Sequence, residues 1–248
     1  MNDLTISLAG LIFYSPTPDA LVAFYRDALA VPLAPAEHGT VGPHFEGSCG
    51  GVHVAVWGEE RHMSGPLVPV FRTRSLDEGA ARVVEAGARQ LHKAIDLGEG
   101  KRVAGFLDPD GRPLRLIEID APIEGVDGEH PRGARAVSAV VFASRDGERT
   151  AAFFERGLGV RFTRGDHAGD PHHEARLGRV RLAIVQGSPE GPGAVAPTFL
   201  ADDLDALTAS LHRWGVDATR TISLGPTKRL ASFRDPDRNA FHAIEVRA

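Results

Sequence analysis

The residues best suited to chemistry in this sequence lie in a repeated pattern. The segment FLDPDGRPLRLIEI begins at Phe106, and FRDPDRNAFHAIEV begins 127 residues later, at Phe233. Five residues after the second Asp of each Asp-Pro-Asp, the first copy has Arg115 and the second has His242. An imidazole can transfer a proton near neutral pH, whereas a guanidinium stays charged and binds carboxylate or phosphate. The pattern predicts two sites of different chemistry, and His242 is a candidate catalytic residue.

A second exchange of the same kind occurs earlier in each copy. PHFEGSCGGVHVAVWG, from Pro43, aligns with PHHEARLGRVRLAIVQG, from Pro171, so that His53 corresponds to Arg181. We take His53 as the second candidate catalytic residue. Arg115 and Arg181 could clamp an acidic ligand, and an ion pair with a local Glu or Asp is the equally favoured alternative.

Three further residues near His53 are candidates for ligand binding. Trp57 lies four residues beyond His53, on the same face of an expected strand, where its ring could stack a planar ligand or pack in the core. His44 and Glu46 precede the GSCGG turn. They share a face with His53 if the turn has two residues and do not if it has three, and the sequence leaves both open. The neighbouring His172 and His173 are predicted at a solvated strand edge.

These residues belong to a duplicated chain. Gly10 to Leu33 aligns with Ala139 to Phe162 at an offset of 129 residues, and the following blocks align at 128, 128 and 127. Four blocks in one order indicate a tandem repeat. We predict a module at residues 1–120, a linker at 121–134 that is rich in Gly, Pro and charge, and a second module at 135–248.

Each module must supply strands and helices that position the candidates. The pattern is strand, helix, then strands, given twice per module. The first helix is expected to begin near Thr17 and Pro18, where a hydroxyl can cap the helix. Ser75 and Glu78 form a capping box for the next helix, which Gly87 ends.

Composition excludes several classes of partner. The chain has 248 residues with 42% hydrophobic and 25% charged residues, as in soluble globular proteins. Its net charge of -5 disfavours nucleic acid. We expect no membrane span, no signal peptide and a cytoplasmic location, and the single Cys49 agrees with a reducing compartment. A small-molecule partner is expected.

The helices DALVAFYRDAL and RTAAFFERGL, with the two F-x-D-P-D segments, resemble the vicinal oxygen chelate superfamily of glyoxalases, bleomycin-resistance proteins, fosfomycin-resistance enzymes and extradiol dioxygenases. The resemblance implies an α+β fold of two tandem modules. Each module would be a pair of βαβββ units forming curved mixed sheets around a concave pocket. It also implies a monomer that acts as an internal pseudo-dimer, or a homodimer.

The resemblance further implies four strand positions where metal-dependent relatives hold their ligands. In the first module these positions carry Gly10, His53, Val68 or Pro69, and Arg115. In the second they carry Ala139, Arg181, Ala196 and His242. No module holds three ligands, so we favour no metal or other cofactor.

An exchanged pairing of units would sort these residues differently. If the front unit of one module pairs with the back unit of the other, His53 meets His242 and Arg181 meets Arg115. Glu46 or His44 could then supply a third donor. The alternative is therefore a divalent metal ion (Zn, Ni, Fe or Mn) held by His53, His242 and Glu46.

The sequence favours a small-molecule-binding protein of the glyoxalase and bleomycin-resistance type, with an organic ligand that is acidic or planar. Its role would be sequestration or a mild acid–base reaction by a pocket histidine. The competing function is a metal-dependent lyase, isomerase or dioxygenase. A third is a scaffold for a protein partner.

Overall fold

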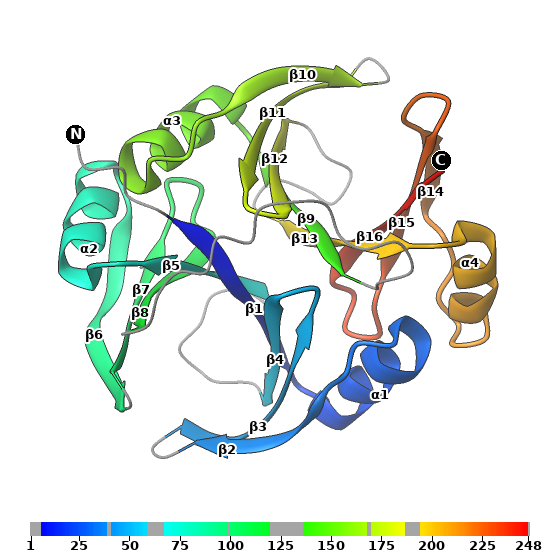
Figure 1. Cartoon of the computed structure of the whole chain (residues 1–248), viewed down its shortest axis with the longest axis horizontal. Coiled ribbons are helices and arrows are strands. Elements are labelled where there is room, and N and C mark those ends of the chain that lie inside the picture. The colour runs from blue at the N-terminus through cyan, green and yellow to red at the C-terminus, as the bar shows by residue number, and fades with distance from the viewer. Residues whose placement is uncertain are drawn as a thin grey trace.

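The computed structural model describes residues 6–38, 41–58, 67–98, 100–119, 136–167, 170–186 and 194–247. Each half of the chain forms one eight-stranded mixed sheet, and Figure 1 shows the two sheets curving inside a rim of helices. The predicted α+β fold with two tandem modules is confirmed. The predicted linker at residues 121–134 lies outside the described residues.

Module 1 contains two units with the same order of elements. The first unit consists of β1 (Ser7–Ser15), α1 (Pro18–Leu29), β2 (Ala34–His38), β3 (Val41–Cys49) and β4 (Val52–Gly58). The second consists of β5 (Leu67–Thr73), α2 (Leu76–Glu85), β6 (Arg89–Gly98), β7 (Lys101–Leu107) and β8 (Pro113–Ile119). The strand order is β2-β3-β4-β1-β5-β8-β7-β6.

Module 2 repeats this arrangement. Its first unit consists of β9 (Val137–Ser144), α3 (Gly147–Leu158), β10 (Thr163–His167), β11 (Asp170–Leu177) and β12 (Val180–Gln186). Its second unit consists of β13 (Val195–Ala201), α4 (Leu204–His212), β14 (Arg220–Ser223), β15 (Lys228–Arg234) and β16 (Ala240–Val246). The strand order is β10-β11-β12-β9-β13-β16-β15-β14.

The helices begin where the sequence predicts, with one difference in capping. Ser75 Oγ accepts a hydrogen bond from the Glu78 backbone N–H (3.3 Å), as a capping box requires. Asp146 caps α3 in the same way. Thr17 precedes α1 but its side chain does not cap the helix. The Thr17 hydroxyl instead donates to Asp237 Oδ1 of module 2 (3.2 Å).

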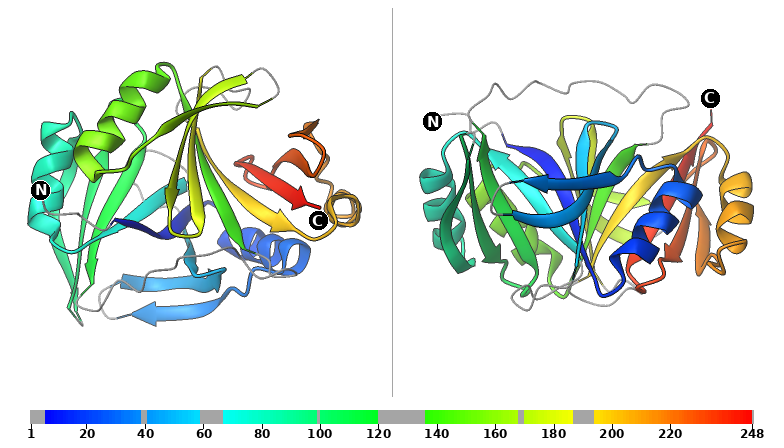
Figure 2. Two further views of the ribbon diagram at one scale, coloured as in Figure 1. Left: turned by 45° about the horizontal axis from the view of Figure 1, so that its top comes forward. Right: turned by 90° about the horizontal axis from the view of Figure 1, so that it is seen from below.

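Each sheet has a helix-covered face and an opposite face, which we call the open face. Leu11, Phe13, Val54 and Val56 are fully buried on the helix-covered side of module 1. Because side chains alternate along a strand, the residues between them point to the open face. Both views in Figure 2 show the helices outside the curved sheets. None of the described helices has the length and apolar character needed to span a membrane.

The first helix of each module also packs against the second unit of the other. In α1, Phe24 lies 6.0 Å from Phe241 of β16, between ring centroids. In α3, Phe154 lies 5.9 Å from Phe71 of β5. The buried apolar residues of both modules form one continuous cluster. The two modules therefore share a core.

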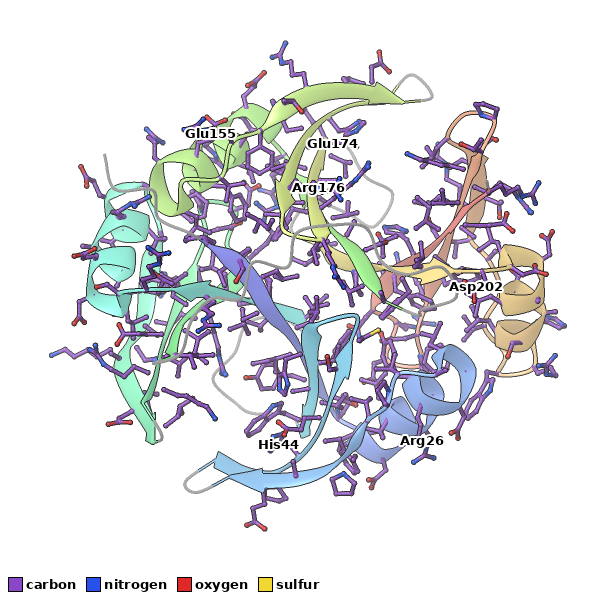
Figure 3. All side chains as sticks on the ribbon, viewed as in Figure 1. Arg26, His44, Glu155, Glu174, Arg176 and Asp202 are labelled. Carbon is purple, nitrogen blue, oxygen red and sulfur yellow. The ribbon has the colours of Figure 1, made fainter. Side chains whose placement is uncertain are left out.

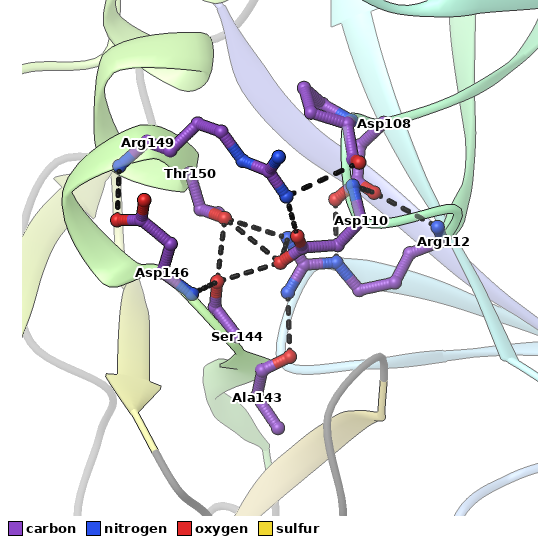
Figure 4. Close-up of polar contacts among 9 residues, drawn as sticks. Asp108, Asp110, Arg112, Ala143, Ser144, Asp146, Arg149 and Thr150 are labelled. Carbon is purple, nitrogen blue, oxygen red and sulfur yellow. Dashed lines mark hydrogen bonds and ion pairs between the residues drawn. The ribbon is translucent and has the colours of Figure 1, made fainter.

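The Asp-Pro-Asp turn after β7 contacts module 2 through a buried polar network, shown in Figure 4. Arg112 donates to Asp108 Oδ2 (2.5 Å) and to the carbonyl of Ala143 (2.9 Å). Ser144 Oγ donates to Asp110 Oδ2 (2.6 Å). The Arg112 side chain is 2% exposed. We call these five residues the Arg112 clasp.

The Asp-Pro-Asp turn after β15 contacts module 1 in the equivalent way. Asp235 Oδ2 accepts hydrogen bonds from Tyr25 Oη (3.0 Å) and Asn239 Nδ2 (2.8 Å). Thr17 Oγ1 reaches Asp237 as described above. We call Thr17, Tyr25, Asp235, Asp237 and Asn239 the Asn239 clasp. Without a cation in the position of Arg112, burial raises the pKa of Asp235 to about 6.

Candidate functional site

A row of four residues crosses the open face of each sheet. In module 1, His53 lies opposite Gly10, Gly10 opposite Val70, and Val70 opposite Arg115. The row therefore has a histidine on β4 and an arginine on β8. Two small or apolar residues lie between them. Three strand spacings separate the ends by about 14 Å along the sheet.

The row of module 2 has the reverse order. Arg181 lies opposite Ala139, Ala139 opposite Thr198, and Thr198 opposite His242. Here the arginine is on β12 and the histidine on β16. Each open face thus has one arginine and one histidine at the ends of its row, and the two residues have opposite positions in the two modules.

The third position of each row differs from the prediction. The structure places Val70 there in module 1, where Val68 or Pro69 was expected, and Thr198 in module 2, two residues beyond the expected Ala196. The helix and Asp-Pro-Asp motifs that guided the alignment lie outside β5 and β13. They do not fix the register of those strands.

The exchanged pairing of units does not occur. β5 pairs with β1 and β13 pairs with β9, so each sheet closes within one half of the chain. His53 therefore shares a sheet with Arg115, and His242 shares one with Arg181. The predicted combination of His53 with His242 on one sheet is not formed. Neither is that of Arg115 with Arg181.

This topology bears on the alternative metal site. His53 and Glu46 lie in one sheet and His242 in the other. At the row positions, Gly10, Val70 and Ala139 have no donor atom in their side chains. Across the described ranges, no three or more His, Cys, Asp or Glu side chains are arranged to hold a metal ion. The residues of the rows do not fit the ligand set implied by the resemblance.

The β3–β4 turn settles the question of which face His44 and Glu46 occupy. Cys49 pairs with Val52, which leaves Gly50 and Gly51 as a two-residue turn. Their φ values are 65° and 84°, which glycine adopts without strain. His44 and Glu46 therefore share the open face with His53.

These three residues make a polar cluster on β3 and β4. Glu46 Oε2 lies 3.3 Å from His44 Nε2 and 3.4 Å from His53 Nε2. His44 Nδ1 lies 3.0 Å from the carbonyl oxygen of Gly42. The His44 side chain is 3% exposed and that of His53 is 49% exposed. The cluster links a buried imidazole to one at the surface, and Figure 3 shows His44 on the inner side of β3.

Trp57 is partly buried on the open face, and stacking of a ligand on its ring stays a prediction. Its ring is partly buried and stacks on His44, with ring centroids 4.2 Å apart and an angle of 7° between the planes. Its Nε1–H is buried and has no hydrogen-bond partner within the described ranges of the chain. An unpaired buried donor is uncommon and calls for an acceptor.

Arg115 does not make the ion pair that the sequence offered as an alternative. Its Nη2 donates to Tyr14 Oη (2.5 Å), and its guanidinium carbon lies 5.8 Å from the centroid of the Tyr14 ring. Among the residues that the structure describes, no carboxylate contacts Arg115. Its Nε is buried and has no hydrogen-bond partner among the described residues. In the described part of the open face of module 1, Arg115 is therefore a partly buried cation without a neutralising charge.

The open face of module 2 buries its histidine instead. His242 is 6% exposed, and its Nδ1 lies 2.9 Å from Ser232 Oγ. Thr198, next to it in the row, is 2% exposed and its hydroxyl has no partner. Arg181 is exposed, and within the described part of the chain it forms no ion pair.

Module 2 contains a second His–Glu pair, which was not predicted from the sequence. His172 Nε2 lies 2.9 Å from Glu174 Oε1, and the His172 side chain is 9% exposed. His172 therefore points to the open face and not to a solvated edge, because it lies opposite Val185. His173 points the other way, and burial lowers its pKa. The repeated PHFE and PHHE segments were the signal that could have revealed the pair.

Comparison with known proteins connects both modules to one family. Residues 11–117 match the family model of a glyoxalase-like domain. Residues 136–243 match that of the glyoxalase/bleomycin resistance protein/dioxygenase superfamily. No curated protein matches the chain in sequence.

Solved structures of low sequence identity share the fold. A variant of homoprotocatechuate 2,3-dioxygenase from B. fuscum has a TM-score of 0.69 and 14% identity, covering 99% of this chain and 72% of that one. A 4-hydroxymandelate synthase mutant from Streptomyces coelicolor has a TM-score of 0.68 and 16% identity, with coverages of 98% and 93%. The Mn(II)-bound glyoxalase from Novosphingobium aromaticivorans has a TM-score of 0.67 and 18% identity, with coverages of 98% and 82%.

Proposed function

Because the chain belongs to the glyoxalase/bleomycin resistance protein/dioxygenase superfamily, also called the vicinal oxygen chelate superfamily, we propose that its open faces bind small organic anions. In each module the ligand lies along the row, between the arginine at one end and the histidine at the other.

The main support for this proposal is the environment of the Arg115 guanidinium. A partly buried guanidinium without a carboxylate partner is unfavourable, and an anionic ligand would offset that cost. Its planar fork matches a carboxylate in two parallel hydrogen bonds. Tyr14 holds the guanidinium in place, which lowers the entropy lost on binding. Arg181 offers the same group in module 2, in a more exposed position.

The histidines give the site a second function. With the acid group of a ligand on the arginine, the rest of the ligand extends toward His53 or His242. An imidazole there can bind a polar group, or accept and return a proton. Sequestration and mild acid–base catalysis both follow from this arrangement, and His53 and His242 are the proposed acid–base residues.

A metal-dependent lyase, isomerase or dioxygenase is the competing function, favoured by the fold shared with the Mn(II)-bound glyoxalase. Metal content of protein purified without chelator tests it. Stoichiometric divalent metal that is lost in both His53→Ala and His242→Ala would support the metal enzyme over our proposal.

We also propose that the chain acts in the cytoplasm as a monomer. The shared core already joins two modules as a dimer of single modules would. Light scattering tests the monomer, and a mass of twice 26.5 kDa would show the homodimer instead.

Thermal unfolding with added carboxylates and phosphates tests the anion sites. A ligand at a hundredfold excess over its Kd adds about 2.7 kcal/mol to the free energy of unfolding. We expect Arg115→Met and Arg181→Met each to lose the part of the stabilisation that belongs to its module. Arg26→Met on the exposed surface of α1 is the control. Equal stabilisation of all three variants would refute the proposal.

A further inference from the structure

The two open faces differ in one neighbouring pair of residues. In module 1, Tyr14 on β1 lies opposite Trp57 on β4. At the same positions of module 2, Ala143 lies opposite Val185. Both pairs point to the open face, four residues along the strands from the rows. Module 1 therefore offers two aromatic rings where module 2 offers two small aliphatic side chains.

The aromatic pair of module 1 is held in position by polar residues of the same face. The His44 ring lies nearly parallel to Trp57 and fixes its plane. The hydrogen bond from Arg115 fixes Tyr14. Flat surfaces held in fixed orientations favour a flat ligand, because little entropy is lost when it stacks.

The unpaired polar atoms of this face are donors. Trp57 Nε1–H and Arg115 Nε–H are both buried without an acceptor. A ligand that satisfies them must carry acceptor atoms, and the charge of Arg115 favours a negative one. A planar ring alone would leave both donors unpaired. A small inorganic anion would leave the partly exposed ring of Trp57 uncovered, whereas the Tyr14 ring is already buried, at 7% exposure.

We infer that the open face of module 1 selects an aromatic carboxylic acid, with its carboxylate on Arg115 and its ring against the partly exposed ring of Trp57. The inference rests on the proposed function and specifies the ligand class for one module. Module 2 lacks the rings and binds organic anions without regard to planarity.

Benzoate and cyclohexanecarboxylate test this selectivity, since they share charge and carbon number and differ in planarity. The chain has two tryptophans, so Trp214→Phe leaves Trp57 as the single indole reporter. Trp214 is 43% exposed and its ring centroid lies 6.1 Å from that of Phe24, so phenylalanine is chosen because it keeps an aromatic ring at this position. We expect benzoate to change Trp57 fluorescence and to bind about tenfold more tightly than cyclohexanecarboxylate, as a ring–ring contact of about 1.4 kcal/mol would give.

Variants assign the preference to the named residues, with affinities from calorimetry in an Arg181→Met background that removes the anchor of module 2. Trp57→Val copies module 2 and should abolish the preference for benzoate. Trp57→Phe keeps a ring without the N–H and should retain part of it, so that a folding defect in one variant does not decide the outcome. Arg115→Met should weaken both acids.

The possible results separate the inference from the proposed function. Equal affinity for the two acids, both lost in Arg115→Met, overturns the aromatic selectivity and leaves the anion site standing. Binding of neither acid, or binding that Arg115→Met does not change, overturns both. A benzoate preference that persists in Trp57→Val and in Trp57→Phe overturns the role of Trp57.

Discussion

At the scale of single residues, the open faces are defined by polar atoms that have no partner. Among the residues that the structure describes, these include Trp57 Nε1 and Arg115 Nε in module 1 and the hydroxyl of Thr198 in module 2. Buried groups of this kind reduce stability unless a ligand satisfies them. Replacing such an atom by an apolar group should therefore raise stability, but it would also remove a group that a ligand could bind.

Thr198→Val tests whether an unpaired buried hydroxyl lowers the stability of the protein. The substitution keeps the shape of the side chain and removes a buried hydroxyl without a partner. We expect the free energy of unfolding, measured with urea, to rise by about 1 kcal/mol. Ser232→Ala is the matched control, because its hydroxyl bonds to His242, and there we expect a loss of about 1 kcal/mol. A loss in Thr198→Val would show that the hydroxyl has a partner in the folded protein.

The sequence predicted which residues occupy the rows, but it did not predict which of them lie on the same open face. His53, Arg115, Arg181 and His242 occupy the row positions expected from the repeat. Which of them share a face depends on whether β1 pairs with β5 of its own module. Long-range packing determines this strand pairing, and the local sequence pattern carries no information about it.

At the scale of elements, the Asp-Pro-Asp turns join one module to the other. The sequence identified them as turns that lead into a last strand. It did not show that their carboxylates reach across to β9, α3 and α1, because these contacts join residues far apart in the chain. The exchange of Arg112 for Asn239 between the two turns makes one clasp charged and the other partly dependent on pH.

The Asn239 clasp predicts how stability varies with pH. The pKa of Asp235 is raised from 3.8 to about 6, chiefly by burial, so the protonated form favours folding. Its contribution is fully present below about pH 4 and is lost as the pH rises toward 6. A shift of about two units corresponds to about 3 kcal/mol.

Urea unfolding between pH 4 and 7 measures this contribution. We expect the stability of the wild type, relative to Asp235→Asn, to fall across that range, because asparagine does not titrate. A difference that stays constant from pH 4 to 7 would show that Asp235 has an ordinary pKa.

At the scale of the whole molecule, the two modules share one hydrophobic core. α1 and α3 each pack against their own sheet and also against the second unit of the other module, and the apolar cluster is continuous. The duplicated sequence predicted two modules correctly. It gave no sign of the shared core, because an apolar helix face looks the same whichever sheet it covers.

A substitution in the Arg112 clasp tests whether the two modules unfold together. Arg112→Met leaves Asp108 buried without its cation, while Asp110 keeps its ion pair with Arg149, and we expect the free energy of unfolding to fall by about 3–5 kcal/mol. Because the clasp spans both modules, near-ultraviolet circular dichroism and intrinsic fluorescence should report one coincident transition at a lower urea concentration. The Arg26→Met control, which breaks an exposed pair with Asp27, should change stability by less than about 1 kcal/mol. A separate early transition of one module would contradict the shared core.

The exchanged order of arginine and histidine has a consequence for how such a protein can evolve. In a dimer of identical chains, every replacement in a row appears on both faces at once, and the two sites stay alike. Here the halves are encoded separately, so each face can acquire its own ligand while the clasps keep the frame. Duplication of the module thus produced two open faces whose residues natural selection can change independently.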